Sequence, residues 1–121
     1  MNEQNQRIID RLIQWGCNVQ GAMPRFLNCT DMYCQLIRSV PEQDDFEALG
    51  NALNAGDKTA TFEKAHALKG VLANMSLTPM YTEVCEIVEL LRSGTMEGVS
   101  SHYEKLMQEK TVLQDILSEK S

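Results

Sequence analysis

Residues 65–70 read Ala-His-Ala-Leu-Lys-Gly and lie inside a run with helical character from Asp57 to Met75. Because a helix has 3.6 residues per turn, Lys69, Gly70 and Ala73 share the side of the helix that carries His66. His66 is offset from the centre of the apolar stripe by roughly a third of a turn, at about 100° per residue. We therefore expect an imidazole that is held at the edge of the core and faces solvent. The residues that predict the buried stripe are Phe62, Ala65, Leu68, Leu72 and Met75.

Gly70 is unusual in this helix, because glycine in a helix interior costs about 1 kcal/mol relative to alanine. One explanation is that it leaves room for another molecule to approach His66. The other is that it allows a neighbouring helix to pack closely. The residues alone leave both explanations open.

The run His66-Ala67-Leu68-Lys69-Gly70, followed by Ala73-Asn74-Met75, resembles the signature of histidine-containing phosphotransfer (HPt) domains. That signature is usually written H-x-L-K-G with a later N-x-G. The segments at 23–37, 46–57 and 84–94 are also similar to this family, so the resemblance extends over roughly residues 8 to 115.

Two positions depart from the family pattern. Ser76 stands where the family often has a second glycine, which puts a close helix crossing at that point in doubt. Val88 stands where some members have a glutamine that hydrogen-bonds the imidazole. The group that orients His66 therefore stays unassigned.

The resemblance implies a phosphorelay intermediate that accepts a phosphoryl group on His66, at Nε2, and exchanges it with the aspartate of a response-regulator receiver domain. It also implies that Lys69, Gly70 and Ala73 support the site and dock the partner. The metal and the acceptor carboxylate would belong to the receiver, so we expect no cofactor, no metal site and no autonomous enzyme activity. A sensor histidine kinase, of the hybrid type, is the expected upstream partner.

A different class of function also fits the residues. The chain could be a non-phosphorylated interaction module that docks receiver or kinase domains, and Ser76 and Val88 favour this alternative. The retained His66, Lys69 and Gly70 argue against it. An autonomous kinase is disfavoured, because the chain has no glycine-rich phosphate loop.

Composition indicates a single all-α domain over residues 1–121. Apolar residues make up 43% of the chain and aromatic residues only 6%, as suits helices that pack on helices. The net charge of −6 argues against a nucleic-acid binder, since phosphate contacts need clustered basic side chains. Within 57–75, however, the charge is +1, which would suit an acidic partner.

Helical periodicity and short connections predict an antiparallel four-helix bundle with an additional N-terminal helix. The expected bundle helices are 30–55, 57–76, 78–93 and 96–118, and the helix 3–15 packs over one end. Pro41 interrupts or restarts the first of them. We expect an irregular segment between Cys17 and Cys29, and the predicted N-cap residues are Thr30, Asp57 and Thr78.

The remaining features predict a cytoplasmic protein, and the resemblance to HPt domains implies a monomer. No cationic start precedes an apolar stretch, and no run approaches the roughly 18 apolar residues of a membrane span. The cysteines show no metal-binding spacing, so we expect reduced thiols. His102 has no motif around it and is interpreted as structural or surface.

Overall fold

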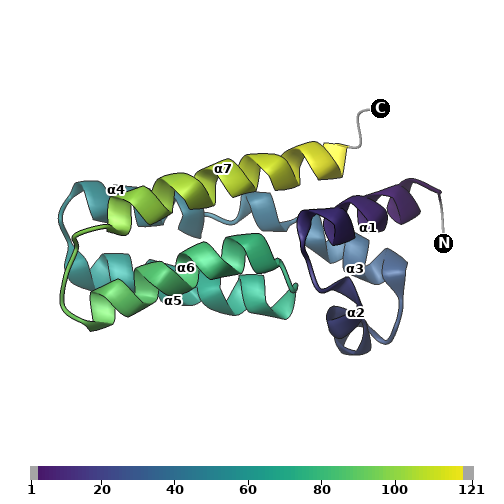
Figure 1. Ribbon diagram of the computed structural model, residues 1–121, viewed down its shortest axis with the longest axis horizontal. Helices are drawn as coiled ribbons and strands as arrows, with labels where there is room; N and C mark the ends of the chain where they lie inside the picture. Colours follow the sequence, from purple (N-terminus) through teal and green to yellow (C-terminus); the bar gives the residue numbers. More distant parts are fainter. Residues whose placement is uncertain (1–2, 119–121) are drawn as a thin grey trace.

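Four helices form the bundle in the computed structural model, which describes residues 3–118. They are α4 (Asp45–Asn54), α5 (Lys58–Asn74), α6 (Thr78–Arg92) and α7 (Val99–Ser118). Helix α5 packs between α4 and α6, and α7 packs against both α6 and α4 (Figure 1). The described residues contain no β-strand. The predicted fold class, an all-α bundle with an N-terminal addition, is therefore confirmed.

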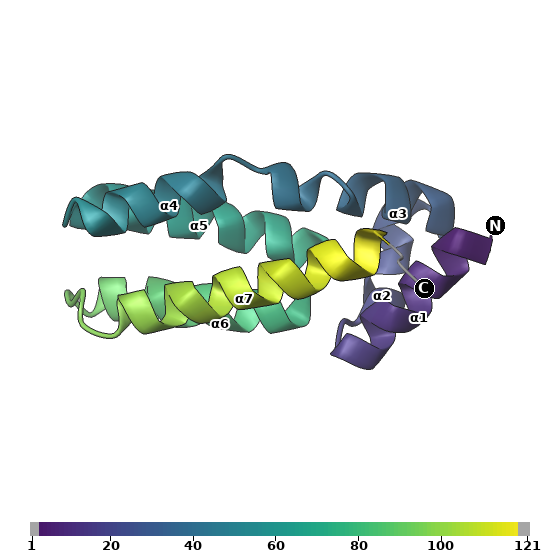
Figure 2. The ribbon, with the colours of Figure 1, turned by 90° about the horizontal axis from the view of Figure 1, so that it is seen from above.

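The N-terminal segment gathers at one end of this bundle. It comprises α1 (Glu3–Trp15), α2 (Val19–Ala22), the 3₁₀ helix η1 (Met23–Phe26) and α3 (Thr30–Ile37). Figure 2 shows the same placement from above, with α1 beside the end of α7. Buried apolar side chains hold the segment together and join it to the bundle core: Ile8, Leu12, Val19, Phe26, Tyr33 and Ile37.

The segment 30–55 is interrupted at Pro41, as the sequence predicted, because proline has no backbone N–H to continue the helical pattern. It forms α3, a 3₁₀ turn η2 (Val40–Glu42) and α4, so the prediction that all of 30–55 is a helix of the bundle was wrong. The segment between Cys17 and Cys29, expected to be irregular, holds α2 and η1. Asn18 caps α2 by accepting a hydrogen bond from the Gly21 backbone N–H at 3.1 Å.

The N-terminal residues of the helices can be compared with the N-cap residues that the sequence predicted. Asp57 caps α5 as predicted, because its Oδ1 accepts from the Ala60 backbone N–H at 3.0 Å. Thr30 and Thr78 are instead the first residues of their helices. Cys29 takes the cap position of α3, and its sulfur lies 3.4 Å from the Met32 nitrogen.

Ser76 ends α5 in the left-handed conformation that usually selects glycine, with φ of 54°. The backbone N–H of Ser76 donates to the Ala73 carbonyl at 3.1 Å, and that of Leu77 donates to the Leu72 carbonyl at 3.0 Å. Arg25 of η1 adds a side-chain clamp. Its Nε lies 3.0 Å from the Asn74 carbonyl oxygen and its Nη2 lies 2.8 Å from Ser76 Oγ. A cation at this end also suits the helix dipole.

Tyr33 of α3 secures the same helix end from inside the protein. Its hydroxyl donates to the Met75 carbonyl at 2.7 Å, and the side chain is fully buried. Burial raises the pKa of this phenol, because the charged form would lose its hydration. The N-terminal segment thus holds the end of α5 by a buried hydrogen bond and an exposed guanidinium.

The described residues contain neither a candidate membrane-spanning helix nor a group of metal ligands. No helix within residues 3–118 is long and apolar enough to cross a bilayer. The same residues contain no cluster of potential metal ligands, and the cysteines are free thiols. Burial raises the pKa of the Cys17 thiol to about 12, so this sulfur stays protonated and unreactive.

We predict that Ser76→Gly stabilises the protein more when Arg25 is absent. A non-glycine residue in the left-handed region costs about 1 kcal/mol, which glycine recovers. In the wild type that gain is offset by loss of the Arg25–Ser76 hydrogen bond, worth about 0.5–1.5 kcal/mol. Urea unfolding of the single and double variants measures the difference. If Ser76→Gly raised the free energy of unfolding equally in the wild-type and Arg25→Ala backgrounds, the Arg25–Ser76 hydrogen bond would not stabilise the protein.

We also predict that Tyr33→Phe lowers the free energy of unfolding by about 1–2 kcal/mol at neutral pH, because the buried Met75 carbonyl loses its donor. Since folding raises the pKa of Tyr33, its contribution is complete below its unfolded pKa of about 10 and is lost as pH rises through the folded value. The difference between wild type and Tyr33→Phe should therefore shrink in strongly alkaline solution, as measured by denaturant titration. A constant difference up to the highest accessible pH would refute this.

Candidate functional site

His66 stands on the outer side of α5 with its side chain exposed. Its imidazole stacks on the ring of Phe62, one turn earlier, with the ring centroids 5.9 Å apart and the planes inclined by 23°. No side chain within residues 3–118 hydrogen-bonds the imidazole. Both ring nitrogens are therefore open to an incoming group.

Of the three lysines of α5, Lys69 is the one without a partner among residues 3–118. Lys58 donates to the Gly94 carbonyl at 2.7 Å, and Lys64 lies 3.8 Å from Asp45 of α4. Lys69 forms neither a hydrogen bond nor an ion pair with any side chain in the described part of the chain. Its partly exposed stem lies one turn beyond His66, so its ammonium group is available to an anion.

Gly70 faces open space. Apart from its chain neighbours and the backbone of its own helix, a Cβ atom built on it would meet no heavy atom of the described residues within 4 Å. The explanation by close helix packing is thus wrong for this glycine. It applies instead to Gly50 of α4, where an added Cβ would collide with the Tyr103 hydroxyl. The space beside His66 is therefore open, and no helix within residues 3–118 fills it.

Ala73 completes the exposed row that starts at His66. It borders a shallow hollow of about 260 Å³ between the end of α5 and the start of α6. Asn18 from the N-terminal segment also borders this hollow, together with Leu72, Ser76, Thr78 and Tyr81. The structure therefore brings the sequence-predicted residues His66, Lys69, Gly70 and Ala73 onto one continuous face.

The residue that sequence reasoning missed is Phe62. It was expected in the buried stripe, but its ring is only partly buried and lies between the core and His66. The available signal was its position four residues before the histidine, which places it on the same side of the helix. Val88, by contrast, is fully buried and offers the imidazole no hydrogen bond.

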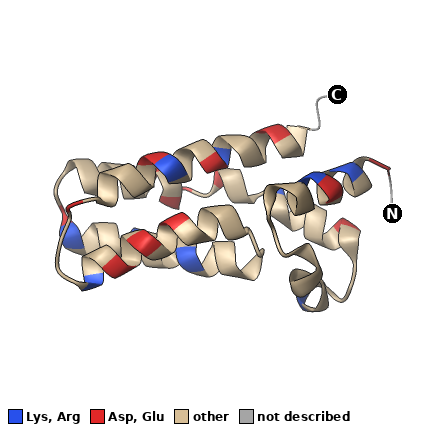
Figure 3. Ribbon diagram, in the orientation of Figure 1, with Lys and Arg blue, Asp and Glu red and all other residues tan. Residues whose placement is uncertain are grey.

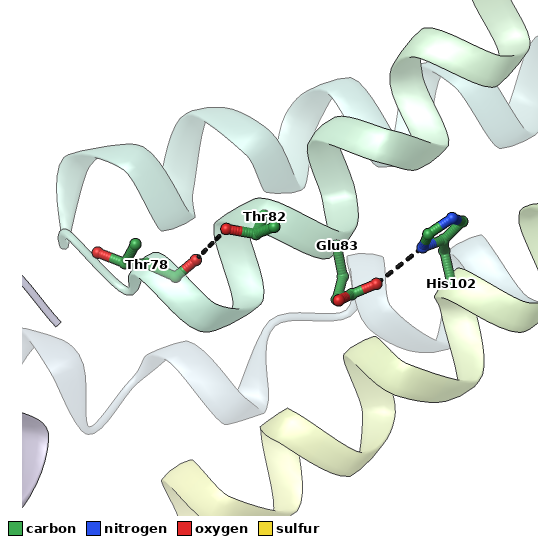
Figure 4. Close-up of polar contacts among 4 residues, drawn as sticks. All are labelled: Thr78, Thr82, Glu83 and His102. Carbon is green, nitrogen blue, oxygen red and sulfur yellow. Dashed lines mark hydrogen bonds and ion pairs between the residues drawn. The ribbon is translucent and has the colours of Figure 1, made fainter. Parts of the chain in front are cut away.

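The second histidine provides a useful contrast. Nδ1 of His102 lies 2.8 Å from Oε1 of Glu83, so the ring bridges α7 and α6 (Figure 4). Both side chains are largely covered, with exposures of 25% and 20%. Near them, the Thr82 hydroxyl donates to the Thr78 carbonyl at 3.0 Å and serves only its own helix. His102 thus has the structural setting that the sequence predicted, whereas His66 has none of these partners.

Charge is distributed unevenly around the exposed face. Helix α5 carries three lysines against the single carboxylate of Glu63, whereas the neighbouring α6 carries three glutamates against Arg92. Figure 3 shows the basic segments of α5 beside the acidic segments of α6. Along α5, Lys69 lies one turn after His66 and the carboxylate of Glu63 lies one turn before it, so an ammonium and a carboxylate flank the imidazole.

The comparison with known families agrees with this geometry. The family model of the Hpt domain matches residues 31–119, which is well over half of the chain. No curated protein and no solved structure matches the chain. The matched region includes α3 from its second residue, α4 to α7 and all four predicted site residues, and it leaves α1, α2 and η1 outside.

Hpt domains are helical bundles that act in phosphotransfer during two-component signalling, as phosphocarriers rather than as enzymes. Their partners are response regulators and histidine kinases. The all-helical bundle described above has the architecture of that family. On the extent of this match, the chain belongs to the Hpt domain family.

Proposed function

We propose that this protein is a phosphorelay intermediate whose phosphorylated residue is His66. The observation that supports this most strongly is the difference between its two histidines. His102 is tied to Glu83, whereas His66 is exposed, has no hydrogen-bond partner within residues 3–118, and lies beside the gap at Gly70. An imidazole used only for structure would not need that gap.

The transfer step requires only the imidazole from this chain. The lone pair of Nε2, the nitrogen farther from the backbone, attacks the phosphorus of an aspartyl phosphate on a response-regulator receiver domain. The N–P bond forms as the P–O bond to the aspartate breaks, and the electron pair leaves with the carboxylate. Nδ1 keeps its proton, so the phosphorylated ring is cationic and can return the phosphoryl group to an aspartate. Positioning and charge stabilisation dominate such reactions, so two proteins can share the task.

The neighbouring residues have complementary roles in this proposal. Lys69 stabilises the phosphoryl oxygens or contacts the acidic site of the receiver, because its ammonium group has no partner in the described part of the chain. Gly70 lets the partner approach the imidazole closely, since nothing occupies the space above it. Ala73 extends the docking face with a side chain too small to obstruct it. A sensor histidine kinase, of the hybrid type, supplies phosphate through its own receiver domain.

The proposal is tested by incubating the protein with a phosphorylated receiver domain. Wild type should acquire phosphate that is labile in acid and stable in base, and His66→Gln should acquire none. His102→Gln is the matched control and should still accept phosphate, because His102 bonds Glu83 rather than facing the gap. Binding of the receiver without transfer to wild type would instead support a docking module without phosphorylation.

Replacing Gly70 should separate stability from transfer. Gly70→Ala removes the cost of a helix glycine without creating a clash, so the free energy of unfolding should rise by about 0.5–1 kcal/mol. Gly70→Gln should keep the fold but slow transfer at least tenfold, a barrier increase of about 1.4 kcal/mol, because its side chain fills the approach to His66. Stopped-flow transfer assays and thermal melts measure the two effects. Unchanged transfer by Gly70→Gln would refute the role given to the gap.

A further inference from the structure

We propose that Phe62 and Arg92 position the imidazole of His66, in place of a hydrogen-bonding side chain. This inference rests on the proposed phosphoryl transfer, but its structural part can be tested separately. The supporting observation is a continuous series of contacts from α6 to the reactive ring. Glu89 holds Arg92, Arg92 lies over Phe62, and Phe62 stacks on His66.

The stack follows from helix geometry. Side chains on a helix lean toward its N-terminus, so the imidazole lies above the turn that carries Phe62. Centroids 5.9 Å apart and planes inclined by 23° fall in the range of offset stacking between aromatic rings. An exposed histidine would otherwise sample several rotamers, and each unproductive rotamer lowers the fraction of molecules ready to react.

Phe62 can serve as a support because it is itself held from two sides. Its inner part packs against the buried core. The guanidinium carbon of Arg92 lies 5.9 Å from its ring centroid, and Arg92 Nη1 lies 3.0 Å from Glu89 Oε1. A helix other than α5 thus contributes to the orientation of the ring that reacts.

Stacking differs from a hydrogen bond in what it leaves free. A hydrogen-bonding partner occupies one nitrogen and fixes the tautomer, whereas a stacked neighbour contacts the face of the ring. Since Val88 is buried in the core and offers no hydrogen bond, the orientation of His66 should depend on Phe62 while its tautomer does not. A loss of ring orientation without a change of tautomer is a result that general destabilisation of the fold would not produce.

The test compares Phe62→Leu, which removes the ring, with Phe62→Tyr, which keeps it. The Tyr hydroxyl has room, because Phe62 borders a surface hollow of about 510 Å³ together with Leu91 and Arg92. Val71→Ala is the matched control: Val71 is a partly buried residue of α5 that lies five positions after His66, on another side of the helix. Arg92→Gln tests the outer support.

Two quantities are measured on each variant. NMR of the His66 ring protons reports the ring current of Phe62, and ¹⁵N couplings report the tautomer. Transfer from a phosphorylated receiver at saturating concentration reports the rate. We expect Phe62→Leu to abolish the ring-current shift, to leave the tautomer ratio unchanged and to slow saturated transfer about two- to tenfold. Phe62→Tyr should behave as wild type, and Arg92→Gln should slow transfer by about twofold.

The proposal is overturned if the ring-proton shifts survive Phe62→Leu, if Phe62→Tyr loses as much rate as Phe62→Leu, or if Val71→Ala slows saturated transfer equally. If wild type accepts no phosphate, the phosphorelay assignment fails. The NMR comparison then still decides whether Phe62 holds the ring.

Discussion

Helix α5 is packed on one side and exposed to water on the other, and this asymmetry determines where the side chain of His66 points. Helices α4 and α6 cover its inner side, where Ala65, Leu68 and Leu72 are fully buried. At roughly 25 cal/mol per Å² of apolar surface, such burial fixes the rotation of the helix about its axis, because turning it would expose the leucines. The outward direction of His66 is a consequence of that fixed rotation.

The ends of α5 are held as firmly as its side. Asp57 caps the N-terminus of α5, and Arg25 and Tyr33 of the N-terminal segment hydrogen-bond the backbone at its C-terminus. Arg25 belongs to η1, which lies outside the family match, yet it bonds the end of the helix that carries His66. The segment therefore contributes to the rigidity of the site without contacting the imidazole.

The sequence was informative wherever a periodic pattern determined the outcome. The spacing of apolar residues placed α5 and α6 and predicted that His66 would face solvent at the edge of the core. It could not decide between the two explanations of Gly70, because the answer depends on whether another helix crosses there. Phe62 was misplaced for a related reason: at the margin of a stripe, helical angle alone does not determine whether a ring is buried or supports a neighbour. The prediction that Thr30 is an N-cap was wrong because the cap position depends on local hydrogen bonding. In α3 that position is taken by Cys29, the residue before Thr30.

The imidazole of His66 has no hydrogen-bond partner within residues 3–118, whereas that of His102 is bonded to Glu83. Carbethoxylation with diethylpyrocarbonate, followed by mass spectrometry of the peptides, measures this directly in the folded protein. We expect His66 to react at a rate close to that of free histidine and His102 to react markedly more slowly, since Glu83 and the α6–α7 interface cover His102. Equal rates, or a His66 that resists the reagent, would contradict the account.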